Sequence, residues 1–136
     1  MLNSRGGVEC DLTVTRLSEN EFYIVTGTAM GIHDSSHIQR SLQSQEVVQI
    51  VDLTSAYGVL GLMGPKAREI LQPLAEENLG NEHFSFAHAR QVMIAGCPVL
   101  AMRLSFTGEL GWELHVPTEY MLTVFDALQE SGRPHG

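Results

Sequence analysis

Alternating apolar and polar residues near the start of the chain predict a β-hairpin. The alternation runs through residues 12–17, and a second strand pattern follows at 21–26. Ser18, Glu19 and Asn20 between them are residues typical of a turn. Further strand patterns occur at 47–53, 57–63, 91–94, 99–105 and 113–116, and residues 95–98 predict a turn between two of them.

Three stretches have the spacing of amphipathic helices. The first covers 32–42, opened by Asp34 or Ser35. The second begins at Gly64-Pro65, where proline suits a first helical turn. The last is capped by Thr118. The predicted inner faces are Ile38 and Leu42 for the first helix, Ala67, Ile70, Leu71 and Leu74 for the second, and Met121, Leu122, Phe125 and Leu128 for the third. The order ββαββαβββα predicts an α+β fold with helices packed on largely antiparallel sheets.

The composition and charge of the chain argue against some classes of binding partner. The chain has 136 residues and a net charge of −8 with scattered basic residues, so we expect no nucleic-acid partner. No apolar run reaches membrane-spanning length, which argues against a membrane partner. Cys10 and Cys97 lie in or beside apolar patterns, so we expect two buried, reduced thiols.

Two stretches, 3–14 and 108–117, each place a carboxylate on a predicted strand beside glycine. The acids are Asp11, which follows Gly6-Gly7, and Glu113. The glycine pair is suited to a turn with positive φ and also lets a flat ligand approach the backbone. Because ionised carboxylates only accept hydrogen bonds, two of them suit a ligand rich in N–H donors, such as a pterin.

These stretches, with 57–65 and 79–84, resemble the folate-binding aminomethyltransferase family. That family includes the glycine cleavage T-protein and the C-terminal half of sarcosine and dimethylglycine dehydrogenases. The sequence of these stretches is most similar to the dehydrogenases. The resemblance implies the T-protein-like folate-binding fold. Residues 1–136 would be the central part of one such domain, with the flavin domain and the C-terminal domain absent.

The resemblance also implies roles for particular residues. Asp11 matches the acid near the reactive folate nitrogens, and Glu113 matches the acid that pairs with the N–H edge of the pterin. Tyr23 falls at an aromatic position of the same pocket, and Gly6, Gly7 and Phe106 fall at further cofactor-binding positions. The T-protein has tyrosine at the position of Phe106 and asparagine at that of Gly27.

The implied function is capture of the one-carbon unit of an N-methylglycine as 5,10-methylenetetrahydrofolate. The implied ligands are tetrahydrofolate in this domain, FAD in the absent one, and a small one-carbon donor. The alternatives are a regulatory module resembling the regulatory subunit of pyruvate dehydrogenase phosphatase, a glycine cleavage aminomethyltransferase, and a folate-binding iron–sulfur assembly protein. The resemblance implies the mitochondrial matrix for a eukaryotic source and the cytoplasm for a bacterial one.

His33 and His37 have the four-residue spacing of metal ligands on a helix. The glutamate of an HExxH motif is missing, and Asp34 stands in the wrong place to replace it. We therefore expect a solvated helix face and no metal site.

Overall fold

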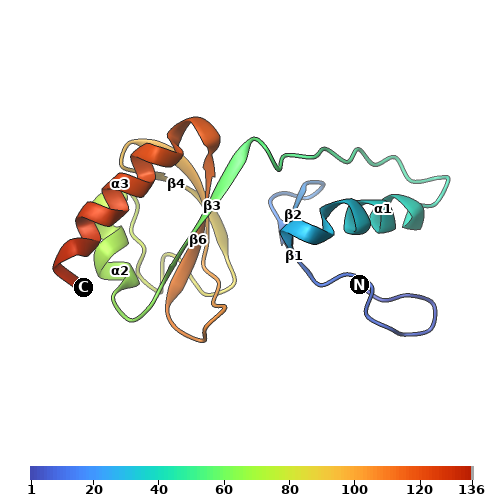
Figure 1. Cartoon of the computed structure of the whole chain (residues 1–136), viewed down its shortest axis with the longest axis horizontal. Coiled ribbons are helices and arrows are strands. Elements are labelled where there is room, and N and C mark those ends of the chain that lie inside the picture. The colour runs from blue at the N-terminus through green and yellow to red at the C-terminus, as the bar shows by residue number, and fades with distance from the viewer. Residues whose placement is uncertain (136) are drawn as a thin grey trace. The chain divides into compact units, whose positions relative to one another are not determined.

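The computed structural model describes residues 1–135, which belong to two compact units, Met1–Val51 and Asp52–Gly136. Both units combine helices with antiparallel strands, which confirms the predicted α+β class (Figure 1). Within residues 1–135, no helix has both the length and the apolar character needed to cross a membrane. Cys10 and Cys97 are both buried and free, as the sequence predicts.

The first unit is a hairpin followed by a helix. Strand β1 (Leu12–Arg16) pairs antiparallel with β2 (Phe22–Thr26), which confirms the predicted hairpin. A 3₁₀ turn, η1 (Thr28–Met30), leads into helix α1 (Gly31–Ser41). The prediction that Asp34 or Ser35 opens this helix is wrong. Because η1 continues directly into α1, the helix begins before both residues, and Asp34 lies buried in its first turn.

The strand predicted at 47–53 is absent from both sheets of residues 1–135. Five apolar side chains of this segment are exposed, and Val47 is 102% exposed relative to a reference residue. A strand is stable only where a neighbouring strand pairs with its backbone. The residues of this segment favour a strand conformation, but the prediction of a strand is wrong. No strand of either sheet pairs with the segment.

The second unit contains a four-stranded antiparallel sheet of order β3-β6-β5-β4. Its elements are β3 (Tyr57–Met63), α2 (Ala67–Leu71), η2 (Gln72–Leu74), β4 (Ala89–Ile94), β5 (Cys97–Met102), β6 (Gly111–Pro117), η3 (Thr118–Tyr120), α3 (Met121–Gly132) and η4 (Arg133–His135). Helices α2 and α3 cover one face of this sheet (Figure 1). The central strand β6 therefore has one face in the core.

The turn between β4 and β5 is tighter than predicted. Ile94 pairs with Cys97, which leaves Ala95 and Gly96 as a two-residue connection in which both residues have positive φ, +50° and +73°. Such a turn matches the right-handed twist of the flanking strands. Cys97 and Pro98, predicted as part of the turn, belong instead to β5.

The core lies between the sheet and helices α2 and α3. Trp112, Leu114 and Val116 alternate along β6, and each is fully buried against this layer. Ala67 and Leu71 of α2 are buried as predicted. The second unit thus has a continuous apolar core fixed by the period-2 pattern of its strands.

The inner face predicted for the last helix is partly wrong. Val124 is fully buried with Met121 and Leu128 beside the core, whereas Leu122 and Phe125 are 71% and 43% exposed. The predicted cap is wrong as well, since the Thr118 hydroxyl donates to the Ser55 carbonyl at 3.0 Å. The turn η3 comes before α3, and the orientation of the helix on the sheet decides which of several apolar residues face inward.

Candidate functional site

The Gly6–Gly7 segment forms a closed turn in the first unit. Gly6 has φ +79°, a conformation that costs other residues free energy. The Asn3 carboxamide oxygen accepts hydrogen bonds from the backbone N–H groups of Arg5 and Gly7, both at 3.0 Å. The turn therefore requires glycine at position 6, as the sequence predicts, while a role in ligand binding stays a prediction.

Asp11 stands directly before β1 and its side chain is exposed. The prediction that Asp11 lies on a strand is wrong by one residue, because β1 begins at Leu12. Continued back from β1, the alternation places Asp11 with Thr13 and Thr15, opposite to Cys10 and Leu12. Tyr23 pairs with Thr15, so Tyr23 lies on the face of Asp11. Asp11 and Thr15 are four residues apart, which is about 13 Å along the strand. The hairpin thus brings the predicted acid and aromatic residue to one face, at its opposite ends.

Behind the hairpin lies a buried carboxylate that the sequence did not reveal as part of a site. Asp34 is 2% exposed and accepts hydrogen bonds from the Thr26 hydroxyl and from His33 Nδ1, the latter at 2.8 Å. The Cys10 Sγ lies within 4.8 Å of this carboxylate and of the His33 ring. These bonds lower the pKa of Asp34, with His33 contributing most. Burial raises the pKa of the Cys10 thiol, so it stays protonated and can donate.

His33 bridges this buried carboxylate and a second acid. Its Nε2 lies 3.4 Å from Glu9 Oε1, and the ring is partly exposed. The bond to Asp34 raises the pKa of His33, because the charged imidazolium can donate from both ring nitrogens.

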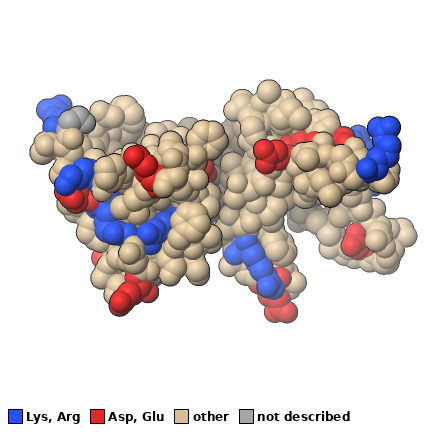
Figure 2. All heavy atoms as spheres, turned by 90° about the horizontal axis from the view of Figure 1, so that it is seen from below, with Lys and Arg blue, Asp and Glu red and all other residues tan. Residues whose placement is uncertain are grey.

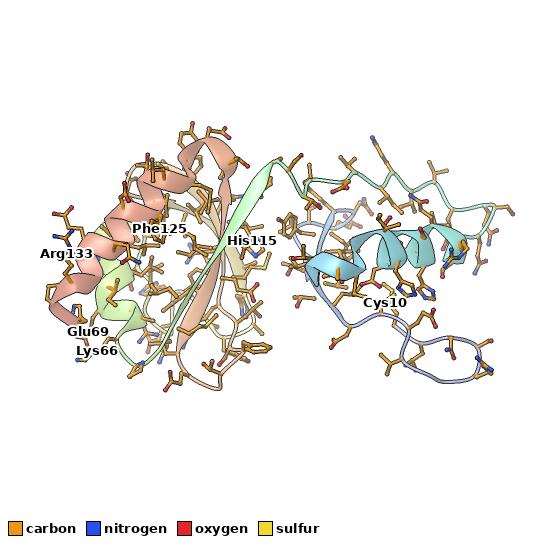
Figure 3. The ribbon with its side chains drawn as sticks, viewed as in Figure 1. Cys10, Lys66, Glu69, His115, Phe125 and Arg133 are labelled. Atoms are coloured by element: carbon orange, nitrogen blue, oxygen red, sulfur yellow. The ribbon has the colours of Figure 1, made fainter. Side chains whose placement is uncertain are left out.

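Cys10, His33 and Asp34 also form a set of donors whose atoms lie within 4.8 Å of one another. Such a set could bind a metal ion, and it differs from the His33–His37 pair considered from spacing alone. Both carboxylate oxygens of Asp34 already accept hydrogen bonds, from Thr26 and from His33. We therefore interpret the cluster as a hydrogen-bonded network (Figure 3 shows Cys10 among the side chains of this unit).

In the second unit, Glu113 occupies the middle of the central strand β6. It pairs with Gly61 on one side and Met102 on the other, and its side chain is 29% exposed. It lies on the face opposite to the buried Trp112 and Leu114, as the alternation predicts. A Cβ atom added at Gly61 would meet nothing within 4 Å. The carboxylate therefore stands beside open space on its sheet face.

His115, two residues further along β6, shares the face of Glu113. Its Nε2 lies 3.5 Å from Glu113 Oε2, and its side chain is fully buried (labelled in Figure 3). Burial lowers the pKa of His115, and the neighbouring carboxylate opposes this only in part. At neutral pH His115 is thus a neutral neighbour of Glu113. The Glu-x-His spacing was the signal in the sequence that could have identified it.

Phe106 lies between β5 and β6 and is 94% exposed. Gly108, in the same connection, has φ +84°. The predicted site residues therefore come from two units: Gly6, Gly7, Asp11 and Tyr23 from the first, and Phe106 and Glu113 from the second.

A groove of about 500 Å³ lies elsewhere in the second unit, on the helical side of its sheet. It is lined by Leu60, Gly61, Leu62, Ile70, Phe125, Leu128, Gln129, Gly132 and Arg133. Glu113 is not among these residues, and its own sheet face is the opposite one.

In Figure 2, acidic and basic side chains both occur across the visible face of the molecule.

The sequence profile of the GCVT N-terminal domain matches residues 1–136. The chain belongs to this family. Mouse mitochondrial sarcosine dehydrogenase is 43% identical over 150 residues, and human mitochondrial dimethylglycine dehydrogenase is 37% identical over 137 residues. Each match covers 100% of this chain and 16% of the relative. The family resemblance predicted from the motifs is therefore confirmed.

Two further relatives extend this comparison. The aminomethyltransferase of Thermoanaerobacter sp. (strain X514) is 34% identical over 136 residues, which is 36% of its length. The heterotetrameric sarcosine oxidase of Corynebacterium sp. U-96, solved in complex with pyrrole 2-carboxylate, superposes with a TM-score of 0.69. That match covers 92% of this chain and 61% of the other at 24% identity, and it shows the shared fold.

Proposed function

We propose that this chain is the tetrahydrofolate-binding part of an enzyme similar to sarcosine and dimethylglycine dehydrogenases. Its role is to capture the one-carbon unit of an oxidatively demethylated N-methylglycine as 5,10-methylenetetrahydrofolate. Family membership over the whole chain supports this proposal. The structural observation that carries it is Glu113, a half-buried carboxylate that stands beside the open space over Gly61.

Glu113 is the proposed anchor of the pterin. An ionised carboxylate accepts hydrogen bonds from two adjacent N–H groups, and charge strengthens both bonds. A side chain at position 61 would occupy the space next to this carboxylate, so Gly61 leaves room for a flat ring. His115, neutral and buried, supports the carboxylate from the same strand without adding a competing positive charge.

Asp11 is the proposed acid at the reacting end. Its exposed carboxylate is suited to orient the folate nitrogens and to hold a proton there. Tyr23, on the same hairpin face, is the proposed aromatic wall, and Gly6, Gly7 and Phe106 are proposed further contacts. When bound, tetrahydrofolate supplies the nitrogen nucleophile of the reaction. The chain contributes position, orientation and exclusion of water.

The matched relatives are much longer than this chain, so the rest of the enzyme is also a proposal. The chain spans 16% of the sarcosine and dimethylglycine dehydrogenases that it matches. We propose that residues 1–136 are the central part of the folate domain and that FAD binds in a separate domain. The mitochondrial names of these relatives support the mitochondrial matrix for a eukaryotic source.

A second candidate function is aminomethyl transfer without a flavin. The 34% identity to an aminomethyltransferase supports it. The two candidates share the folate site and differ in the donor of the one-carbon unit. An enzyme of the first kind would depend on an N-methylated amino acid and an electron acceptor, and one of the second kind on a carrier-bound aminomethyl group.

Calorimetric titration of tetrahydrofolate into the chain tests the folate site. We expect Asp11→Asn and Glu113→Gln each to weaken binding about tenfold or more, because each removes a charged hydrogen-bond acceptor. Gly61→Val should also weaken binding, since its side chain would fill the space beside Glu113. The matched controls are Asp126→Asn and Glu130→Gln, two exposed acids of α3, with affinities within twofold of the unchanged chain. A folded chain that binds no tetrahydrofolate, or binds it equally well in all five variants, would refute the proposal.

A further inference from the structure

We propose that Asp34 is a positioning residue that fixes the direction of Asp11 through Cys10 and Thr26. This inference rests on the proposed function, in which Asp11 is the acid at the reacting end. Asp34 itself is 2% exposed and lies behind the hairpin, so it acts without touching a ligand.

Asp34 accepts two hydrogen bonds, and side chains from three segments of the first unit lie beside it. The Thr26 hydroxyl donates from the end of β2, and His33 Nδ1 lies 2.8 Å from Asp34 Oδ1 within α1 itself. The Cys10 Sγ, from the residue preceding Asp11, lies within 4.8 Å of the Asp34 carboxylate. One carboxylate therefore links the helix to the end of β2 and lies beside the segment that leads into β1. The amino group of Met1 also donates to the Cys10 carbonyl at 2.8 Å, so Cys10 is held through its backbone as well as its thiol.

The register of the hairpin directs this restraint to Asp11. Thr26 pairs with Leu12, the residue that follows Asp11, and Cys10 precedes it. Leu12 and Thr26 share the strand face toward Asp34. Continued back from β1, the alternation places Cys10 on that face and the Asp11 side chain on the opposite one. Fixing both neighbours of Asp11 on one face thus fixes the direction of its carboxylate on the other.

Asp11 needs such a restraint from its neighbours. Within residues 1–135 the structure shows no hydrogen bond that holds its exposed side chain, so the backbone alone sets where the carboxylate points. Burying a carboxylate is costly unless it is fully hydrogen-bonded, and an apolar residue would fill the site of Asp34 at lower cost. A rigid hydrogen-bonded support is the kind of second layer that a catalytic acid requires.

Backbone ¹⁵N relaxation tests the restraint without any ligand. Asp34→Asn should lower the order parameters of Cys10 and Asp11 and leave those of β6 unchanged. Thr26→Val, which replaces the hydroxyl with a methyl group of similar size, should have the same effect, and Thr26→Ser, which retains the hydroxyl, should keep the original values. Unchanged order parameters in both Asp34→Asn and Thr26→Val would overturn the inference.

A double-mutant cycle with tetrahydrofolate tests whether Asp34 acts through Asp11. We expect Asp34→Asn to weaken binding about tenfold in the unchanged chain and less than twofold in the Asp11→Asn background. Equal weakening in both backgrounds would overturn the inference, because Asp34 would then act independently of Asp11. If the unchanged chain fails to bind tetrahydrofolate, the proposed function fails, and the relaxation measurements alone decide the positioning role.

Discussion

At the scale of single residues, the two acids of the first unit behave in opposite ways. Asp11 is exposed directly before a strand, and Asp34 is buried in the first turn of a helix, with Thr26, His33 and Cys10 around it. Their local sequences do not distinguish these roles, since Asp34 also fits the pattern of a helix cap. The difference comes from Thr26 and Cys10, which reach Asp34 from other segments of the unit.

The network around Asp34 predicts a pH dependence that can be assigned to one histidine. The bonds to Asp34 and Glu9 raise the pKa of His33, so the folded unit binds its proton more tightly than the unfolded chain. The resulting stabilisation is complete below the ordinary value of 6.5 and is lost as pH rises through the raised pKa. An NMR titration of the His33 ring should therefore have its midpoint above 6.5, and Asp34→Asn should lower that midpoint.

Hydrogen exchange in β1 and β2 provides the matching stability measurement. The local free energy of opening should fall on the alkaline side of this titration in the unchanged chain. His33→Gln should remove the fall, while His37→Gln, one turn along the same helix, should retain it. A pH dependence that survives in His33→Gln would contradict the assignment.

At the scale of elements, the period-2 pattern predicted strands well wherever a partner strand exists. The hairpin β1–β2 and the strands β3 and β6 lie where the alternation placed them. The segment 47–53 also has a strand-like apolar pattern, but it has no strand partner in either sheet. Likewise, α3 has more apolar residues than its inner face can accommodate, so spacing alone could not select Val124 over Leu122 and Phe125.

The contrast between a paired and an unpaired apolar segment can be measured. Val47→Ala should change the free energy of unfolding by less than about 0.5 kcal/mol, because its side chain is already in solvent. Val99→Ala in β5 should cost about 2 kcal/mol, because its side chain is fully buried. Chemical denaturation followed by circular dichroism measures both. A cost of 2 kcal/mol at Val47 would show that the segment is packed in solution.

At the scale of the whole molecule, charge sets an expectation for folate binding. The chain carries a net charge of −8, and the glutamate tail of a folate is also acidic. Long-range repulsion should therefore weaken binding at low salt and be screened as the ionic strength rises. Titrations at about 0.01 M and about 0.15 M salt, between which the Debye length falls from roughly 30 Å to roughly 8 Å, should show a few-fold tighter binding at the higher salt.

The opposite salt dependence would have a distinct meaning. Affinity that falls with salt indicates attraction between the tail and nearby arginines. Arg68 and Arg103, whose guanidinium groups both lie 5.7 Å from the Trp112 ring centroid, are basic residues of the second unit that can be tested by substitution. The measurement therefore distinguishes the field of the whole chain from a local basic contact.

The sequence by itself determined the family, the α+β class, the free thiols, and the strand face that carries Glu113. These features are local, because the pleat of a strand alternates its side chains whatever lies beyond them. Tertiary structure decided that 47–53 stays unpaired, that Val124 faces the core, and that Asp34 joins Cys10, Thr26 and His33. Burial and hydrogen-bond partners depend on segments distant in sequence. A local pattern contains no information about which of these segments pack against a given residue.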